Sequence, residues 1–170
     1  MHEAAPHRAA LTDVLVDDVT WRCATRARRA EWTLAISELV EEAVLRTSTA
    51  VDTLRAFVLI ESSAVSVSFV DLRGVEIGRL AVNRLTIAPV FREYMKILRS
   101  LSQGDLAEIS PHYEALDIAR RLVHDDAAEL LQRHSDAVYP DQPTARRMFT
   151  LLVLLTHDTT KLHAVPQWQT

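Results

Sequence analysis

The feature that most constrains this fold is a change of hydrophobic period across residues 54–82. Apolar residues there recur at every second position in the segments LRAFVLIE, AVSVSFVDL and VEIGRLAVN. A period of two is typical of strands, because successive side chains point to opposite faces of the sheet. The pairs Ser62-Ser63 and Arg73-Gly74 lie where hairpin turns are needed. The pattern predicts an antiparallel three-stranded meander, with a strand at residues 11–16 as a candidate fourth.

The middle segment also predicts which face of the sheet is buried. Val65, Val67 and Phe69 point one way, and Ser66 and Ser68 point the other. Antiparallel sheets commonly pack one face on the core and leave the other in water. We therefore expect the serine-lined face to meet solvent and the Val/Phe face to cover helices.

Helical periodicity dominates the rest of the chain. Apolar residues recur at helical spacing over residues 28–45, 89–103, 110–132 and 144–157. Pro89 is expected to open the second of these helices and Gly104 to end it, and Ser110 is a suitable N-cap for the third. The last helix is apolar on nearly every side, which indicates that it is largely buried.

Together these patterns predict an α+β fold, in which an antiparallel meander of three or four strands packs against three or four helices. A length of 170 residues indicates a single domain spanning residues 1–170. Residues 1–10 are expected to form a loose N-terminal arm, and residues 159–170 an irregular tail.

Composition argues against several classes of protein. Only three glycines are present, whereas phosphate-cradling loops depend on glycine. The net charge of −4 provides no field that attracts nucleic acid. Cys23 is the only cysteine, so no internal disulfide can form. The longest apolar run, residues 151–155, is too short for a membrane span, and we expect a cytoplasmic protein.

Neither a metal site nor a cofactor is expected. The doublets His124-Asp125 and His157-Asp158 faintly resemble those of metal-dependent phosphohydrolases. Adjacent residues of a helix point about 100° apart, however, so a doublet alone chelates poorly.

The helix at residues 110–132 contains an arginine that its apolar pattern does not explain. Arg121 falls on the outer side, four residues from both Asp117 and Asp125, and is expected to be a surface charge. Arg120 instead falls within the apolar stripe. Since an unpaired buried guanidinium costs several kcal/mol, Arg120 is expected to meet an internal partner, to reach the edge of the stripe, or to face a bound anion. His124 lies one turn further on.

The last helix has a narrow polar line formed by Arg146, Thr150 and His157. One interpretation places this line at the solvent edge. The other places it across a cleft from Arg120 and His124, where arginine forks would bind carboxylate or phosphate oxygens.

Several segments resemble a known family. IESSAVSVSFVDLRG, APVFRE, YEALDIARRLVHDDAAELL and TARRMFTLLVLL are similar to segments of Uncharacterised Protein Family (UPF) number 0262, which are small bacterial proteins. The likeness is strongest at Ala119-Arg120-Arg121 and Ala145-Arg146-Arg147. This chain departs from the family pattern over residues 122–127, at Glu93 and at its longer C-terminus. The resemblance implies a shared fold and carries no activity with it.

Two functions remain open. The first is a non-enzymatic module that binds a partner protein, a second copy of itself, or a small anionic ligand. The second is a small enzyme that clamps a carboxylate or phosphate substrate with Arg120 and Arg146 and uses His124 as general acid or base. The apolar last helix favours association, for which a twofold homodimer is the commonest arrangement.

Overall fold

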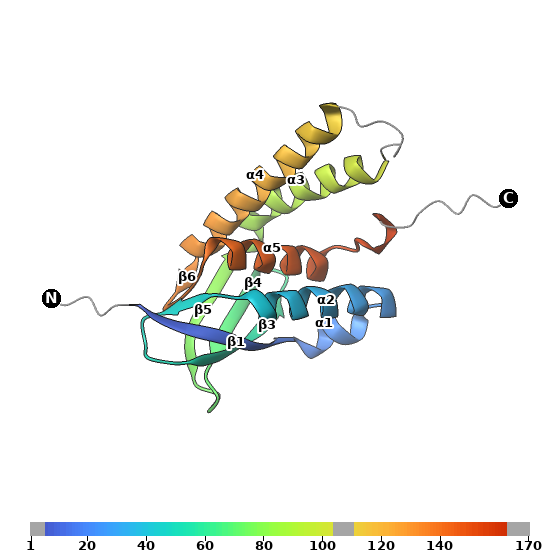
Figure 1. Ribbon diagram of the computed structural model, residues 1–170. Coiled ribbons are helices and arrows are strands. Elements are labelled where there is room, and N and C mark those ends of the chain that lie inside the picture. Colours follow the sequence, from blue (N-terminus) through green and yellow to red (C-terminus); the bar gives the residue numbers. More distant parts are fainter. Residues whose placement is uncertain (1–5, 104–110, 163–170) are drawn as a thin grey trace.

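The computed structural model describes residues 6–103 and 111–162. Figure 1 shows the helices and strands in chain order. The elements are β1 (His7–Val16), α1 (Asp18–Cys23), α2 (Arg26–Glu42), β2 (Leu45–Thr47), β3 (Thr53–Ile60), β4 (Ala64–Val70), β5 (Glu76–Asn83), α3 (Arg84–Gln103), α4 (Pro111–Arg133), β6 (Ser135–Asp136), β7 (Val138–Pro140), α5 (Gln142–Thr156) and a 3₁₀ turn (Thr160–Leu162).

The sheet is larger than the sequence predicts, and it is mixed. Its strand order is β6-β5-β4-β3-β1-β2-β7. β1 pairs with β3 in parallel, whereas every other neighbouring pair is antiparallel. The predicted antiparallel sheet of three or four strands is therefore wrong. The helices α1 and α2 form the long crossover that a parallel pair requires, and the two- and three-residue strands are too short to produce an alternating pattern.

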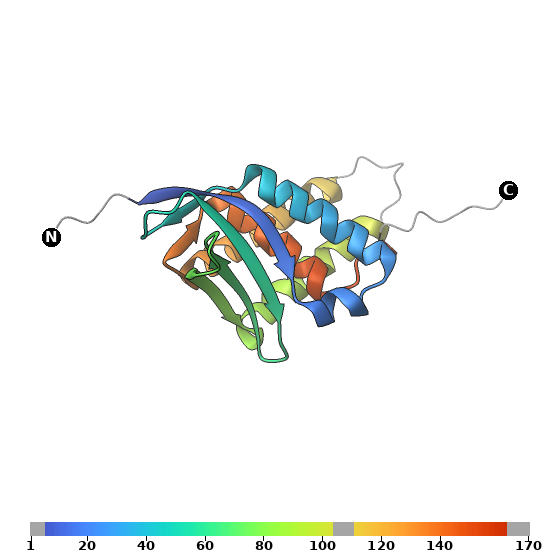
Figure 2. The same cartoon turned by 90° about the horizontal axis from the view of Figure 1, so that it is seen from below.

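One short segment ties the two ends of this sheet together. β6 pairs with β5, and β7 pairs with β2. Only Ala137 separates β6 from β7, and its φ of 60° turns the chain between them. The backbone amide of Ser48 donates a hydrogen bond to the Ala137 carbonyl at 3.0 Å. The sheet is thus nearly closed, like a barrel (Figure 2).

Gly78 in β5 lies directly against this segment. A Cβ atom at Gly78 would lie 2.4 Å from the Asp136 carbonyl oxygen and 2.8 Å from the Val138 amide nitrogen. Both are backbone atoms, so they cannot swing aside. The close approach of β5 to residues 135–140 therefore requires glycine at this position.

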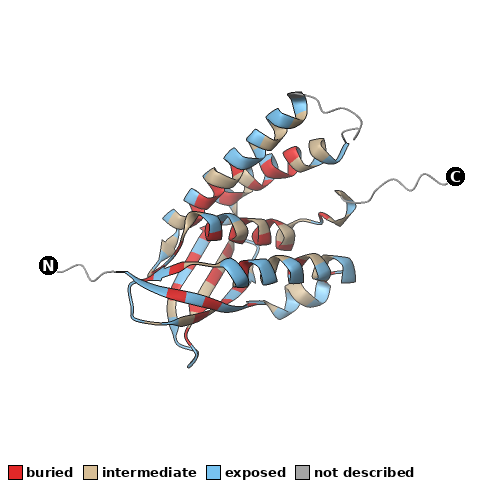
Figure 3. Cartoon of the chain, viewed as in Figure 1, coloured by how far each residue is buried: buried red, intermediate tan, exposed pale blue. Residues whose placement is uncertain are grey.

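The core lies between one face of the sheet and α5, as predicted. Val65, Val67 and Phe69 are buried, whereas Ser66 and Ser68 lie on the opposite face and are half-buried. From α5, Met148 and the neighbouring leucines pack against the buried strand residues. Figure 3 shows buried positions concentrated on α5 and the strands behind it.

The prediction that the last helix is buried is confirmed, but its partners belong to the same chain. Helix α5 contacts α2 on one side and α4 on the other (Figure 1). Trp32 of α2 is 1% exposed, and its Nε1 donates to the Leu154 carbonyl at 2.8 Å. A homodimer is thus not needed to bury α5, and the argument for association from this helix no longer holds.

Several predicted boundaries are wrong by a few residues. β1 begins at His7, so residues 7–10 are not a loose arm. Helix α3 begins at Arg84, and Pro89 lies inside it, because the Asn83 side chain already accepts the Leu85 amide at 2.8 Å. Part of the tail predicted to be irregular forms the 3₁₀ turn. The predicted helix end at Gly104 and the Ser110 cap lie outside the described residues.

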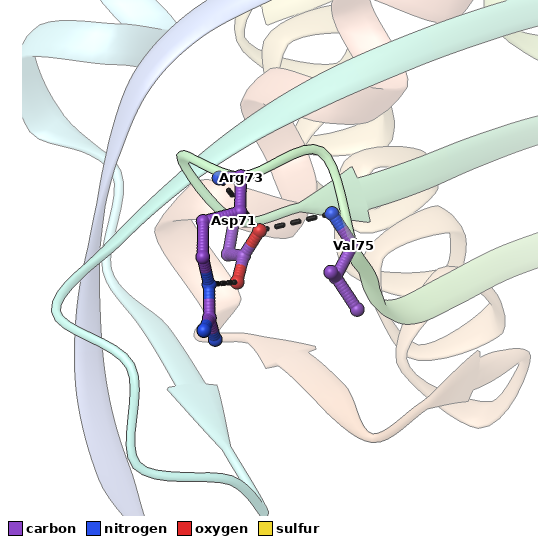
Figure 4. A network of polar contacts seen from close by, with 3 residues as sticks. All are labelled: Asp71, Arg73 and Val75. Carbon is purple, nitrogen blue, oxygen red and sulfur yellow. Dashed lines mark hydrogen bonds and ion pairs between the residues drawn. The ribbon is translucent and has the colours of Figure 1, made fainter.

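The turn between β4 and β5 lies where the sequence predicts it and is organised by Asp71 (Figure 4). The Asp71 carboxylate accepts hydrogen bonds from the backbone amides of Arg73 and Val75, each at 2.9 Å. These bonds, chiefly the one from Val75, hold the pKa of Asp71 below its usual value. Gly74 supplies the positive φ of 82° that the turn needs.

Candidate functional site

Arg120 does not lie inside the apolar stripe of α4. Its side chain is 44% exposed and pairs with Asp117, one turn earlier, at 2.7 Å. Arg121 pairs with the same carboxylate at 2.7 Å, as the spacing predicts. Helical spacing places Arg120 within the stripe, and of the three outcomes that the sequence left open, the side chain reaches the edge and pairs with an acid there. The α3–α4 pair extends away from the sheet, however, and leaves this part of α4 open (Figure 1).

His124 is held by aromatic rings where α3, α4 and α5 meet. Its ring lies edge-on to Tyr94, with centroids 4.8 Å apart, and edge-on to Phe149 at 5.5 Å. Burial, followed by the charges of Arg120 and Arg146, lowers the pKa of His124 to about 4. The imidazole is therefore neutral at pH 7.

Arg146 lies beside His124 but is already paired. Its Nε donates to the Asp125 carboxylate at 2.6 Å. The adjacent Arg147 forms an ion pair with Glu42 of α2.

The hydroxyl of Thr150 donates to the Arg146 carbonyl at 3.2 Å. His124, Arg146 and Thr150, together with Arg147 and Pro143, line an open hollow of about 280 Å³, which we call the α4–α5 hollow.

His157 lies elsewhere. Its ring is edge-on to Phe91 at 5.4 Å, and Phe91 in turn lies 5.7 Å from Phe149. Aromatic rings thus stand between His157 and His124. Three of the five predicted site residues share the α4–α5 hollow, Arg120 is not among the residues that line it, and His157 faces a different hollow beside α3.

The charges of the α4–α5 hollow are balanced within the chain. Arg120, Arg146 and Arg147 each have a carboxylate partner. Such pairs are exposed and individually weak, but an entering anion would have to compete with them. Among residues 6–103 and 111–162, no group of three or more His, Cys, Asp or Glu side chains is placed to hold a metal ion.

We expect His124 to make stability depend on pH. Its folded pKa of about 4 is below the unfolded value of 6.5, so the unfolded state binds more protons between these limits. Stability should therefore be lost as pH falls from 6.5 towards 4. Melting curves of His124→Gln should show a shallower decline across this window, with some slope remaining because burial also lowers the pKa of His157. An unchanged slope in the variant would contradict the assignment.

The outward face of the sheet carries a second feature, an apolar patch that crosses β1 and β3. Leu15 and Phe57 are register partners on neighbouring strands, and Leu59 lies two residues further along β3. The three side chains are 38%, 40% and 42% exposed. We call them the sheet-face patch. They line a hollow of about 730 Å³ that continues across Ser66 and Ser68.

Carboxylates lie at one end of this hollow, where β1 and β3 end. Asp17, Asp18 and Glu61 contribute to its lining there. Asp18 is paired with Arg22. Within the described part of the chain, neither Asp17 nor Glu61 forms an ion pair. Sequence reasoning missed the patch, although residues 56–60 are apolar at successive positions, which indicates a strand covered on both faces.

The fold and these hollows define an α+β protein with a nearly closed mixed sheet and helices packed on its inner face. In the described part of the chain, no helix is both long and apolar enough to cross a bilayer. No solved structure matches the chain.

The chain belongs to the Uncharacterised protein family (UPF0262), whose model matches residues 8–158. It is 31% identical over 157 residues to a UPF0262 protein of Erythrobacter litoralis, covering 89% of this chain and 97% of the relative. It is also 31% identical over 162 residues to one from Phenylobacterium zucineum, covering 91% and 98% respectively. A Novosphingobium aromaticivorans relative is 43% identical over 65 residues, which are 38% of this chain and 40% of that protein. The resemblance inferred from the sequence is confirmed, and these matches indicate no activity.

Proposed function

We propose that this protein is a non-enzymatic binding module that holds a segment of a partner protein on the open face of its sheet. The observation that carries the proposal is the sheet-face patch. Leu15, Phe57 and Leu59 lie side by side over a hollow although the chain has a well-filled core elsewhere. Contiguous exposed apolar surface is costly in water and commonly marks an interaction site.

The surroundings of the patch define the chemistry of the partner. Asp17 and Glu61 leave negative charge at one end of the hollow, whereas Arg79, on its other side, is neutralised by Glu76 at 3.0 Å. Ser66 and Ser68, the register partners of Leu59 and Phe57 on β4, place hydroxyl groups directly beside the patch. A complementary segment would place apolar side chains on the patch, polar groups over the serines and a lysine or arginine beside the carboxylates.

A second candidate is the small enzyme or anion-binding site at the α4–α5 hollow. The observation in its favour is that His124, Arg146 and Thr150 line one hollow, which is one of the two arrangements that the sequence leaves open. Neutral His124 can accept a proton or a hydrogen bond there. The paired arginines weigh against this candidate, because a ligand must displace Asp125 and Glu42 from them.

Peptide display on the immobilised protein tests both candidates. We expect enriched peptides to combine apolar residues with a lysine or arginine. Phe57→Ser should reduce their affinity about tenfold or more, because a central apolar anchor is lost. Leu34→Ser is the matched control, since Leu34 is 62% exposed on α2 and remote from the patch.

Two further variants show which of the two surfaces binds the selected peptides. Glu61→Lys should weaken the basic peptides further, mainly through slower association. Arg146→Gln should leave peptide binding unchanged. If Arg146→Gln abolished binding while Phe57→Ser retained it, the second candidate would replace the first.

A further inference from the structure

A separate hollow lies between the first half of α3 and the C-terminal end of α5. Its volume is about 240 Å³, which suits a small molecule and not a protein segment. Leu85 and Phe91 supply apolar surface, while Arg84, Arg92, Thr156 and His157 supply polar groups. We call it the α3–α5 hollow.

The arginines of this hollow differ from those of the α4–α5 hollow because carboxylates do not balance them. Within the described residues, neither Arg84 nor Arg92 forms an ion pair. Asp158 directly follows His157, and its carboxylate accepts the Thr160 hydroxyl at 2.6 Å. The two guanidinium groups that line the hollow therefore remain available to a ligand.

The pKa of His157 is lowered by burial and by the positive charges around this hollow. Burial lowers its pKa most, and the charges of Arg84, Arg99 and Arg28 lower it further, with no carboxylate opposing them. The Val153 carbonyl acts in the other direction. The ring is held in place by Phe91 at 5.4 Å and by the Thr156 hydroxyl, which lies 2.9 Å from Nδ1. It is thus a fixed neutral group at the edge of a cationic hollow.

Arg28 of α2 adds positive charge near His157 and hydrogen-bonds to the C-terminal end of α5. One of its terminal nitrogens donates to the carbonyls of Leu154, Leu155 and His157 at 3.2 to 3.4 Å. Its guanidinium also stacks on Trp32 at 5.1 Å. These contacts occupy Arg28, so it contributes to the electrostatic potential of the hollow without being placed to contact a ligand.

We propose that the α3–α5 hollow binds a phosphate group, either as the free anion or on a small phosphate monoester, through Arg84, Arg92 and His157. The planar arginine fork matches two phosphate oxygens. A phosphate monoester carries nearly two negative charges at pH 7, which two unpaired guanidinium groups and an imidazole that can take up a proton would balance. Leu85 and Phe91 leave apolar room for a short organic part. This site shares no residue with the sheet-face patch, so either proposal can fail alone.

Histidine titration by NMR tests the proposal directly. The full chain is titrated in inorganic phosphate and, separately, in sodium chloride of equal ionic strength. We expect phosphate to raise the pKa of His157 by about one pH unit, since a nearby anion stabilises the imidazolium. The pKa of His124 should stay where it is, which makes it an internal control. No change at His157, or an equal change at both histidines, would overturn the proposal.

Variants distinguish phosphate binding at the α3–α5 hollow from nonspecific attraction of phosphate to positively charged surface. Arg84→Gln and Arg92→Gln should each weaken phosphate binding about tenfold, because each removes a charge-assisted hydrogen bond. Arg133→Gln, at an exposed position of α4, should leave it unchanged. Tighter binding of phenyl phosphate than of inorganic phosphate would identify a phosphate monoester as the ligand, and equal binding would identify the free anion. Unchanged phosphate binding by the Arg84→Gln/Arg92→Gln double variant, with its fold intact by circular dichroism, would refute the site.

Discussion

Gly78→Ala is expected to destabilise the protein severely, by about 3 kcal/mol or more, because the added methyl group meets backbone and not side chain. The new Cβ would lie 2.4 Å from the Asp136 carbonyl oxygen, far inside van der Waals contact. Relief requires β5 to separate from the segment that joins the two ends of the sheet. For a chain of this size the melting temperature should fall by about 10 °C, which differential scanning calorimetry measures.

Gly74→Ala is the matched control for this prediction. Gly74 has a φ of 82° and nothing within 4 Å of an added Cβ. Its replacement introduces only the local cost of a left-handed conformation, about 1 kcal/mol. If the two variants melted at the same temperature, the close approach of β5 to residues 135–140 would not be the reason for glycine at position 78.

Phe149→Ala should have an effect of similar size for a different reason. Phe149 is fully buried in α5, and its ring contacts Phe91 at 5.7 Å, Tyr94 at 5.3 Å and His124 at 5.5 Å. Removing such a ring leaves a cavity that rigid neighbours cannot fill, which typically costs about 3 to 5 kcal/mol. Denaturant unfolding should show this as a lower midpoint.

The same variant should also change the titration of His124. Burial is the chief cause of its low pKa, so the space left by Phe149 should admit water and move the pKa back towards 6.5. Phe57→Ala is the matched control, because Phe57 is 40% exposed and lies on the outer face of the sheet. Equal loss of stability in the two variants would contradict the placement of the aromatic cluster in the core.

The buried face of the sheet and the buried helix could be predicted from the sequence, because burial produces a periodic pattern of apolar residues. The alternation of Val65, Val67 and Phe69 with serines identified the buried face of the sheet, and the apolar run of α5 identified a buried helix. Pairing direction leaves no such trace, because a strand has the same period in parallel and antiparallel sheets. The parallel partnership of β1 with β3 was therefore missed, and so were β2, β6 and β7, which are too short to show any period.

The candidate sites show a similar limit. The helical spacing of Arg146 and Thr150 correctly placed them on one side of α5, and both line the hollow beside His124. Spacing within a helix does not say how far a neighbouring helix covers it, so the sequence left three surroundings open for Arg120, and the structure places it at an exposed edge beside Asp117. Nor does it reveal ion pairs between elements, such as Arg147 with Glu42. Arg84 and Arg92 could be found only after folding placed α3 beside the end of α5.

Mapping a selected peptide by amide chemical-shift perturbation tests the proposed function most directly. The proposed binding to the open face predicts the largest changes at Leu15, Phe57, Leu59, Ser66 and Ser68, and predicts that Phe57→Ser removes them. The amides around His124 and Arg146 should stay unperturbed. Chemical-shift changes concentrated on α4 and α5, without changes in the strands, would contradict the proposal that the sheet face is the binding surface.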